Sequence, residues 1–162
     1  MTTEIETPKR GYMPRSKSDV WNTPRATFDA LKKEFNFQLD AAANAENALC
    51  ANYFGPGSPF SEDGLSVSWR LPVGAAYEGM NICVWCNPPY SNLSAWIEKA
   101  YNEAALGCRV VMLIPARTDT IAWHTWILNR PGVEVRFLKG RLKFSGHANS
   151  APFPSAVVIF SS

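Results

Sequence analysis

The stretch that decides the fold is ICVWCNPPYSNLSAWIEKAYNEAALGCRVVMLI, residues 82–114. It opens with a continuous apolar run, 82–86, and closes with another, 110–114, and between them apolar residues recur at helical spacing over 91–106. Continuous apolar runs are typical of strands buried on both faces, and a helix between two such strands indicates a parallel pair with a crossover. The sequence therefore predicts an α/β fold, with a mostly parallel sheet and helices on both faces.

The N-terminal part adds a helix and a strand to this unit. We expect a loosely ordered arm over residues 1–18, because they are polar and contain scattered charges. An amphipathic helix follows over 24–35, with Thr23 as its N-cap and Pro24 at its first position. A short strand over 37–40 comes next.

The remaining segments are irregular in the middle and regular toward the C-terminus. Residues 54–79 are rich in Gly, Pro and Ser and predict a long irregular segment, with a short strand or turn over 63–69. The other expected elements are a helix over 119–128, a strand over 133–138, a loop or edge strand over 140–144, and a last strand over 156–160.

The length of 162 residues predicts one domain, which we place at 19–162. No apolar stretch approaches the roughly 20 residues of a membrane span, so no membrane partner is expected. The net charge is +2, but it is unevenly distributed. Residues 105–162 carry seven Lys and Arg against two Asp and Glu, whereas residues 1–104 carry nine against twelve. The C-terminal third is therefore where we expect an acidic partner to bind.

Four cysteines accompany an N-terminus without an apolar signal segment, so we expect a reducing, cytoplasmic location and free thiols. Cys83 and Cys86 form a C-x-x-C pair, which is half of a zinc site. No second pair follows at ligand spacing, and both residues lie in an apolar run. We therefore expect buried structural thiols and no bound metal.

The tetrapeptide Asn87-Pro88-Pro89-Tyr90 follows directly after the first apolar run. Two prolines restrict the backbone, so a rigid loop is expected at the carboxyl edge of the sheet. Such a loop can present the Asn87 side-chain carbonyl and the Pro88 main-chain carbonyl as two fixed acceptors beside an aromatic ring. An exocyclic amino group of a nucleobase needs such acceptors to become a nucleophile, and a flipped base can stack on the Tyr90 ring. The alternative is a Pro-Pro turn whose tyrosine only packs.

At this point the chain resembles a known family, the small phage-type DNA N6-adenine methyltransferases that depend on S-adenosylmethionine. The resemblance extends from about Val20 to Phe160. The segments that carry it are WNTP (21–24), FDALKKEF (28–35), FQLDAAA (37–43), DGL (63–65), VWCNPPYSNLSAWIEKA (84–100), VVMLIPARTDT (110–120) and FLKGRLKF (137–144).

The resemblance implies a Rossmann-like methyltransferase fold, S-adenosylmethionine as cofactor and DNA as partner. It further implies methylation of phage DNA at N6 of adenine, as protection against host restriction. The motif NPPY alone is also compatible with methylation of cytosine N4 or of a protein glutamine. A catalytically inactive DNA-binding module with this fold is another alternative.

Residue by residue, the resemblance implies a role for each motif position. Asn87, Pro88, Pro89 and Tyr90 are the expected catalytic residues. The methionine end of the cofactor is expected to lie near Thr23 and Pro24, and its ammonium group is expected to pair with Asp40. Its adenine amino group is expected to donate to Asp63, and its adenine ring to lie against Leu65. The alternatives are a plain helix cap at Thr23 and loop carboxylates at the two acids.

One segment departs from the family pattern. Many methyltransferases have a Gly-rich turn after the acid of the first strand, whereas this chain has Ala41-Ala42-Ala43-Asn44. We expect Ala41 and Ala42 to replace glycine there in contacting the cofactor. The alternative is that the altered turn does not bind the cofactor, so that the chain is a catalytically inactive DNA-binding module.

Nucleic-acid contacts are expected from the basic C-terminal third. The expected phosphate ligands are Arg117, Lys139, Arg141 and Lys143, and Phe144 resembles the aromatic residue that closes the second face of the flipped base. An edge strand protected by basic side chains is the alternative. Because no separate target-recognition domain is expected, a short or relaxed recognition site is predicted.

Overall fold

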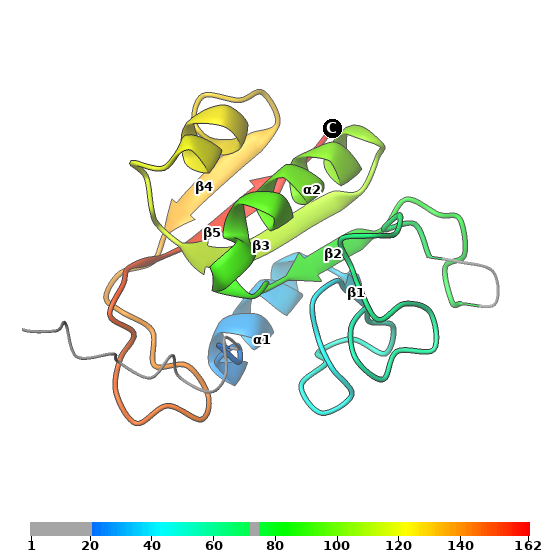
Figure 1. Cartoon of the computed structure of the whole chain (residues 1–162), viewed down its shortest axis with the longest axis horizontal. Coiled ribbons are helices and arrows are strands. Elements are labelled where there is room, and N and C mark those ends of the chain that lie inside the picture. Colours follow the sequence, from blue (N-terminus) through cyan, green and yellow to red (C-terminus); the bar gives the residue numbers. More distant parts are fainter. Residues whose placement is uncertain (1–20, 72–74) are drawn as a thin grey trace, which may run out of the picture.

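A single five-stranded sheet organises the computed structural model, which describes residues 21–71 and 75–162 (Figure 1). Its strand order is β1-β2-β3-β5-β4. The strands are β1 (Phe37–Asp40), β2 (Cys83–Cys86), β3 (Arg109–Pro115), β4 (Val133–Phe137) and β5 (Ser155–Phe160). β1 pairs with β2 and β2 with β3 in parallel, whereas β5 is antiparallel to both β3 and β4. Four of the five strands therefore share one direction, which confirms the mostly parallel sheet.

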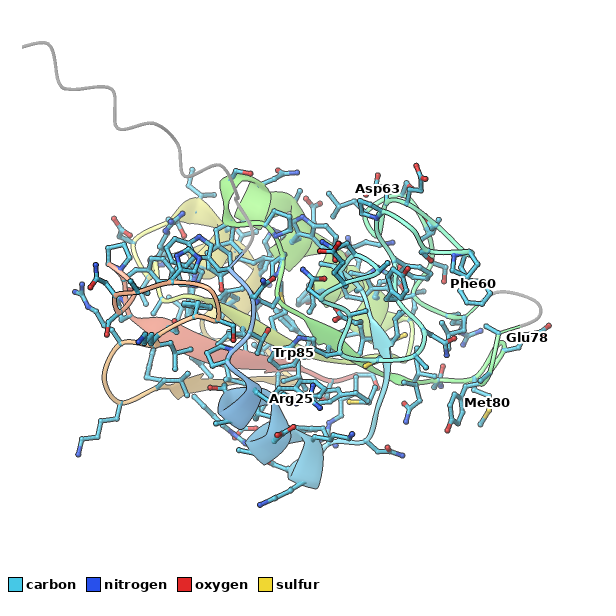
Figure 2. All side chains as sticks on the ribbon, turned by 90° about the horizontal axis from the view of Figure 1, so that it is seen from below. Arg25, Phe60, Asp63, Glu78, Met80 and Trp85 are labelled. Atoms are coloured by element: carbon cyan, nitrogen blue, oxygen red, sulfur yellow. The ribbon has the colours of Figure 1, made fainter. Side chains whose placement is uncertain are left out.

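Helices cover both faces of this sheet, as predicted. α1 (Arg25–Glu34) lies on one face, and α2 (Leu93–Ala105) lies on the other with the loop that carries Asp63 (Figure 2). α1 buries Phe28, whose ring meets the Trp85 ring of β2 edge-on at 5.3 Å. The amphipathic spacing in each helix thus places one apolar stripe against the sheet.

The core is centred on β3 and β5. All six residues of β5 are buried, as are the last six of β3. Strands buried on both faces need apolar side chains at every position, which explains why the run over 110–114 is continuous rather than alternating. The predicted crossover from β2 through α2 to β3 is confirmed.

One predicted element is shorter in the structure. The helix expected over 119–128 covers 121–127, and its last five residues, Trp123–Ile127, are π-helical. The Thr120 hydroxyl donates to the carbonyl of Arg117, and this local bond competes with helix formation at the expected start. The segment over 140–144 is a loop and residues 63–69 form turns, and each of these was one of the two expectations for its segment.

The first helix also begins one residue later than expected. Pro24 is the N-cap with extended backbone, and no side chain caps the helix. The prediction of Thr23 as cap was therefore wrong, because its hydroxyl bonds to Asn87 instead. The arm predicted over 1–18 lies outside the described residues. Within the described ranges, the helices lack the length and apolar character that a bilayer crossing requires.

Candidate active site

The carboxyl ends of β1, β2 and β3 meet at one edge of the sheet, and a cavity of about 300 Å³ opens there. Its walls include several predicted site residues: Thr23, Asp40, Ala42, Asp63, Asn87, Pro88 and Pro89. Pro24, Ala41, Leu65 and Tyr90 are not among the described residues that line it. Parallel α/β sheets bind ligands at this edge, so the topology brings most of the predicted site into one place.

Asn87 is held by three hydrogen bonds. Its amide nitrogen donates to the main-chain carbonyl of Trp21 at 2.5 Å and to the hydroxyl of Thr23 at 2.9 Å. Its carbonyl oxygen accepts a hydrogen bond from the Tyr90 hydroxyl at 2.8 Å. This oxygen keeps a second lone pair for another donor, as the predicted catalytic role requires.

Tyr90 lies inside an aromatic cluster. Its ring is 5% exposed, and Trp21 lies nearly parallel to it, with 6.5 Å between ring centroids and an interplanar angle of 14°. Phe144 and Phe153 meet the Tyr90 ring edge-on at 6.3 and 5.6 Å. The His147 ring stacks on the Trp21 indole, with 4.3 Å between the two ring centroids. Burial raises the pKa of the Tyr90 hydroxyl well above its ordinary value.

Three members of this cluster escaped the sequence analysis, namely Trp21, His147 and Phe153. The signal for Trp21 is its place directly before the predicted cofactor segment, as an aromatic residue beside a polar arm. His147 and Phe153 lie in a loop that has no periodicity, so no local pattern indicates them. The expected partner Phe144 is in the cluster, but it meets Tyr90 edge-on and is itself buried.

Asp40 is a buried carboxyl group at the end of β1, 3% exposed. Burial raises its pKa to about 7, although the N–H groups of Leu49 and Ala42 donate to its two oxygens and act in the opposite direction. A carboxyl group in this state is ready to ionise when a cation binds beside it. Its environment is therefore suited to an ammonium ligand.

The turn after Asp40 obtains its close contacts from glycines elsewhere in the chain. A Cβ on Gly64 would lie 2.1 Å from the Ala41 carbonyl oxygen, and one on Gly55 would lie 1.6 Å from that of Ala43. The irregular segment 54–79 can therefore press its backbone directly against the alanine turn. Glycine at these two positions is therefore required by the packing of the segment on the turn.

The irregular segment is tied to α2 by a buried carboxylate. Glu103 accepts a hydrogen bond from the Trp69 main-chain N–H at 3.2 Å and pairs with Lys99 at 2.6 Å. The Trp69 indole N–H donates to the Gly64 carbonyl at 2.7 Å. These contacts position Asp63, whose carboxylate accepts from the Leu65 N–H at 2.9 Å.

The four predicted phosphate ligands are exposed: Arg117, Lys139, Arg141 and Lys143. Arg117 follows the carboxyl end of β3 and lies near enough to Tyr90 for its positive charge to favour ionisation of that hydroxyl. The other three lie in the loop between β4 and β5, in which Ser145 forms an isolated bridge with Asn22. The basic side chains therefore lie on the loop beside the aromatic cluster.

Cysteines form no cluster at this edge. Cys83 and Cys86 are three positions apart in β2, so their side chains point to opposite faces of the sheet and cannot share a metal ion. All four thiols are free, and burial raises the pKa of Cys83 to about 11. Across residues 21–71 and 75–162, no three His, Cys, Asp or Glu side chains are grouped to hold a metal.

Comparison with known proteins assigns the chain to a family. Residues 10–160 match the family described as DNA N-6-adenine-methyltransferase (Dam). A DNA N-6-adenine-methyltransferase of Escherichia phage T1 is 32% identical over 113 residues, which are 69% of this chain and 42% of that protein. One of Haemophilus phage HP1 is 24% identical over 132 residues, or 80% of this chain and 68% of that protein. The chain thus spans less than half of the phage T1 relative, and it belongs to the DNA N-6-adenine-methyltransferase (Dam) family.

Proposed function

We propose that this protein transfers a methyl group from S-adenosylmethionine to N6 of adenine in DNA. The observation that carries the proposal is the position of the Asn87 side-chain carbonyl oxygen, which is held by a hydrogen bond directly after the carboxyl end of β2, in a residue that lines the cavity. The names of the two phage relatives support adenine as the acceptor. Their phage origin supports a role in modifying viral DNA, which would take place in the cytoplasm of the host cell.

The charge of the cavity favours this cofactor over a phosphate-bearing one. Among the described residues that line it, Asp40, Glu62 and Asp63 carry carboxylates, and none carries a basic side chain. S-adenosylmethionine bears an ammonium and a sulfonium group, and its sulfonium supplies the methyl group when it is bound. Asp40 would pair with the ammonium group, and Asp63 would accept from the adenine amino group.

Asn87 and Pro88 would act on the amino group of the target base. The nitrogen lone pair is delocalised into the ring, so the amino group is a weak nucleophile until two carbonyl oxygens accept hydrogen bonds from its N–H groups. Those bonds draw the nitrogen toward tetrahedral geometry and stabilise the positive charge that develops on it. The free lone pair of the Asn87 oxygen and the main-chain carbonyl of Pro88 are the two acceptors.

The base would stack on Tyr90, and this requires a rearrangement. The Tyr90 ring is 5% exposed and is covered by Trp21 and two phenylalanines. A base that leaves the double helix can reach the ring only if part of this cover moves. Trp21 is the half-buried member with the parallel orientation, so we expect its indole to move.

DNA would be held mainly through its phosphates. Lys139, Arg141 and Lys143 lie in the exposed loop in which Ser145 contacts Asn22, next to the aromatic cluster. Such contacts position the duplex without reading its sequence, so a short or relaxed recognition site is expected.

Methyl transfer from labelled S-adenosylmethionine to DNA, followed by nucleoside analysis, tests the proposal. We expect N6-methyl-2′-deoxyadenosine as the labelled nucleoside, and N4-methyl-2′-deoxycytidine or labelled protein in its place would overturn the proposal. Asn87→Ala should lower the transfer rate by roughly 100-fold or more, the usual effect of losing one such bond in a transition state. Asn102→Ala, on the exposed side of α2, is the matched control and should keep full activity. A wild-type chain that binds no S-adenosylmethionine in calorimetry would instead support an inactive module.

A further inference from the structure

The orientation of the Asn87 amide is determined by its neighbours. The Trp21 main-chain carbonyl can only accept, so the amide nitrogen must face it, at 2.5 Å. The second amide proton points to the Thr23 hydroxyl oxygen at 2.9 Å. With both protons bound on one side, the carbonyl oxygen faces the Tyr90 hydroxyl on the other side.

Thr23 is available for this contact because it does not cap the helix that follows it. α1 begins at Arg25, its N-cap is Pro24, and no side chain bonds to the free N–H groups of the first turn. The first main-chain bonds of the helix run from the N–H groups of Thr27 and Phe28 to the carbonyl of Pro24, so neither group needs the Thr23 hydroxyl. The Thr23 hydroxyl is thereby directed toward Asn87, 64 positions further along the chain.

We propose that Thr23 is a positioning residue of the methyl transfer, which holds the Asn87 amide with its oxygen toward the target amino group. This inference rests on the proposed function, because Asn87 is the acceptor there. A reversed amide would present its own N–H groups to the amino group of the base, and two donors would then face each other. The Trp21 carbonyl excludes this reversal because it can only accept, and the Thr23 hydroxyl restrains the amide further by accepting from its second N–H group. The Thr23 bond also polarises the amide and increases the negative charge on the oxygen that accepts the hydrogen bond of the amino group.

This role differs from the one that the sequence predicts for Thr23. Contact with the methionine end of the cofactor would make S-adenosylmethionine affinity depend on the hydroxyl group. A positioning role instead makes the turnover number depend on it and leaves cofactor affinity unchanged. Because Thr23 lines the cavity, the two roles separate by kinetics rather than by location.

Thr23→Val, Thr23→Ser and the control Thr27→Val test the inference. Valine keeps the shape of threonine but cannot accept a hydrogen bond, whereas serine keeps the acceptor. We expect kcat to fall by about tenfold or more in Thr23→Val, to stay near the wild-type value in Thr23→Ser, and to be unaffected by Thr27→Val in the first turns of α1. The Kd for S-adenosylmethionine should be the same in all four proteins.

Two results would overturn the inference: a Thr23→Val variant with wild-type kcat, or equal losses in the valine and serine variants. A weaker Kd with unchanged kcat would also reject it and would favour the cofactor role. A second readout does not depend on activity, namely the side-chain amide resonances of Asn87 in NMR spectra. Slow exchange of those protons should be lost in Thr23→Val and kept in Thr23→Ser. If the wild-type chain methylated no DNA, the proposed function would fail while this measurement still reported on the Thr23 contact.

Discussion

The indole of Trp21 lies nearly parallel to the ring of Tyr90, with 6.5 Å between ring centroids and an interplanar angle of 14°, while the Trp21 main-chain carbonyl accepts a hydrogen bond from Asn87. One residue therefore covers the expected stacking surface with its side chain and holds the expected acceptor with its backbone. A change in the side chain should leave the second contact intact. This separation makes Trp21 a suitable position for detecting entry of the target base.

Trp21 should report base entry by fluorescence. If its indole moves off Tyr90, adenine-containing oligonucleotides should change the tryptophan emission of the wild-type protein, and that change should be absent from Trp21→Phe. Trp126→Phe is the control, because Trp126 packs on Tyr101 away from the cluster and should keep the response. An identical change in the wild type and Trp21→Phe would mean that Trp21 does not move.

Cofactor affinity should depend on the ionisation of Asp40. Burial raises its pKa to about 7, so the group is mostly protonated at pH 5.5 and half ionised at pH 7. Only the ionised form pairs with an ammonium group, which remains protonated throughout this range because an α-amino pKa is about 8. Affinity for S-adenosylmethionine should therefore rise by about tenfold from pH 5.5 to pH 7, with release of a proton on binding. Calorimetry in buffers of different ionisation enthalpy measures both quantities.

Asp40→Asn is the matched variant for that titration. It should bind the cofactor weakly and with a flat pH profile between pH 5.5 and 7. A wild-type affinity that is equally flat would exclude Asp40 as the partner of the ammonium group.

The basic loop should dominate the salt dependence of DNA binding. Each phosphate contact contributes about 0.9 to the slope of log K against log salt concentration on duplex DNA. Lys139→Ala, Arg141→Ala and Lys143→Ala should each reduce that slope by about one and should do so for any sequence. Lys33→Ala removes an exposed charge from the last turn of α1 and is the control, with an expected slope equal to that of the wild type. Unchanged slopes in all three loop variants would place the DNA elsewhere.

Glu103 should be important for stability. Its removal leaves the buried Trp69 N–H without an acceptor and Lys99 without its ion pair, so Glu103→Ala should lower the free energy of unfolding by about 2–4 kcal/mol. Glu103→Gln keeps an acceptor oxygen and should lose less. Chemical denaturation measures both variants against Glu98→Ala, an exposed position on α2 where the change should stay within about 0.5 kcal/mol. Equal midpoints for Glu103→Ala and Glu98→Ala would contradict this assignment.

Local patterns predicted the regular elements well. The continuous apolar runs became β2 and β3, and the amphipathic run between them became α2. The helix expected over 119–128 is shorter than predicted, because a side-chain bond from Thr120 to the Arg117 carbonyl stabilises a turn where the helix was expected to begin. Helical periodicity does not reveal such a bond.

For the candidate site too, residues were identifiable from local patterns but not from contacts between distant segments. Asp40 and Asn87 were identifiable because Asp40 ends one strand and Asn87 directly follows another, and the ends of parallel strands share one edge. The packing contacts of Gly55 and Gly64 with the alanine turn were not identifiable, because they join segments that lie apart in the sequence.

The sequence by itself determined the order of strands and helices and the place of the NPPY loop at a strand end, because periodicity and proline restriction act within a few residues. Only the tertiary structure decided that Trp21 and Thr23 hold the Asn87 amide, across 66 and 64 positions, and that Tyr90 is covered. Contacts between such distant segments depend on how the packed elements place them, and no local preference of either segment contains that information.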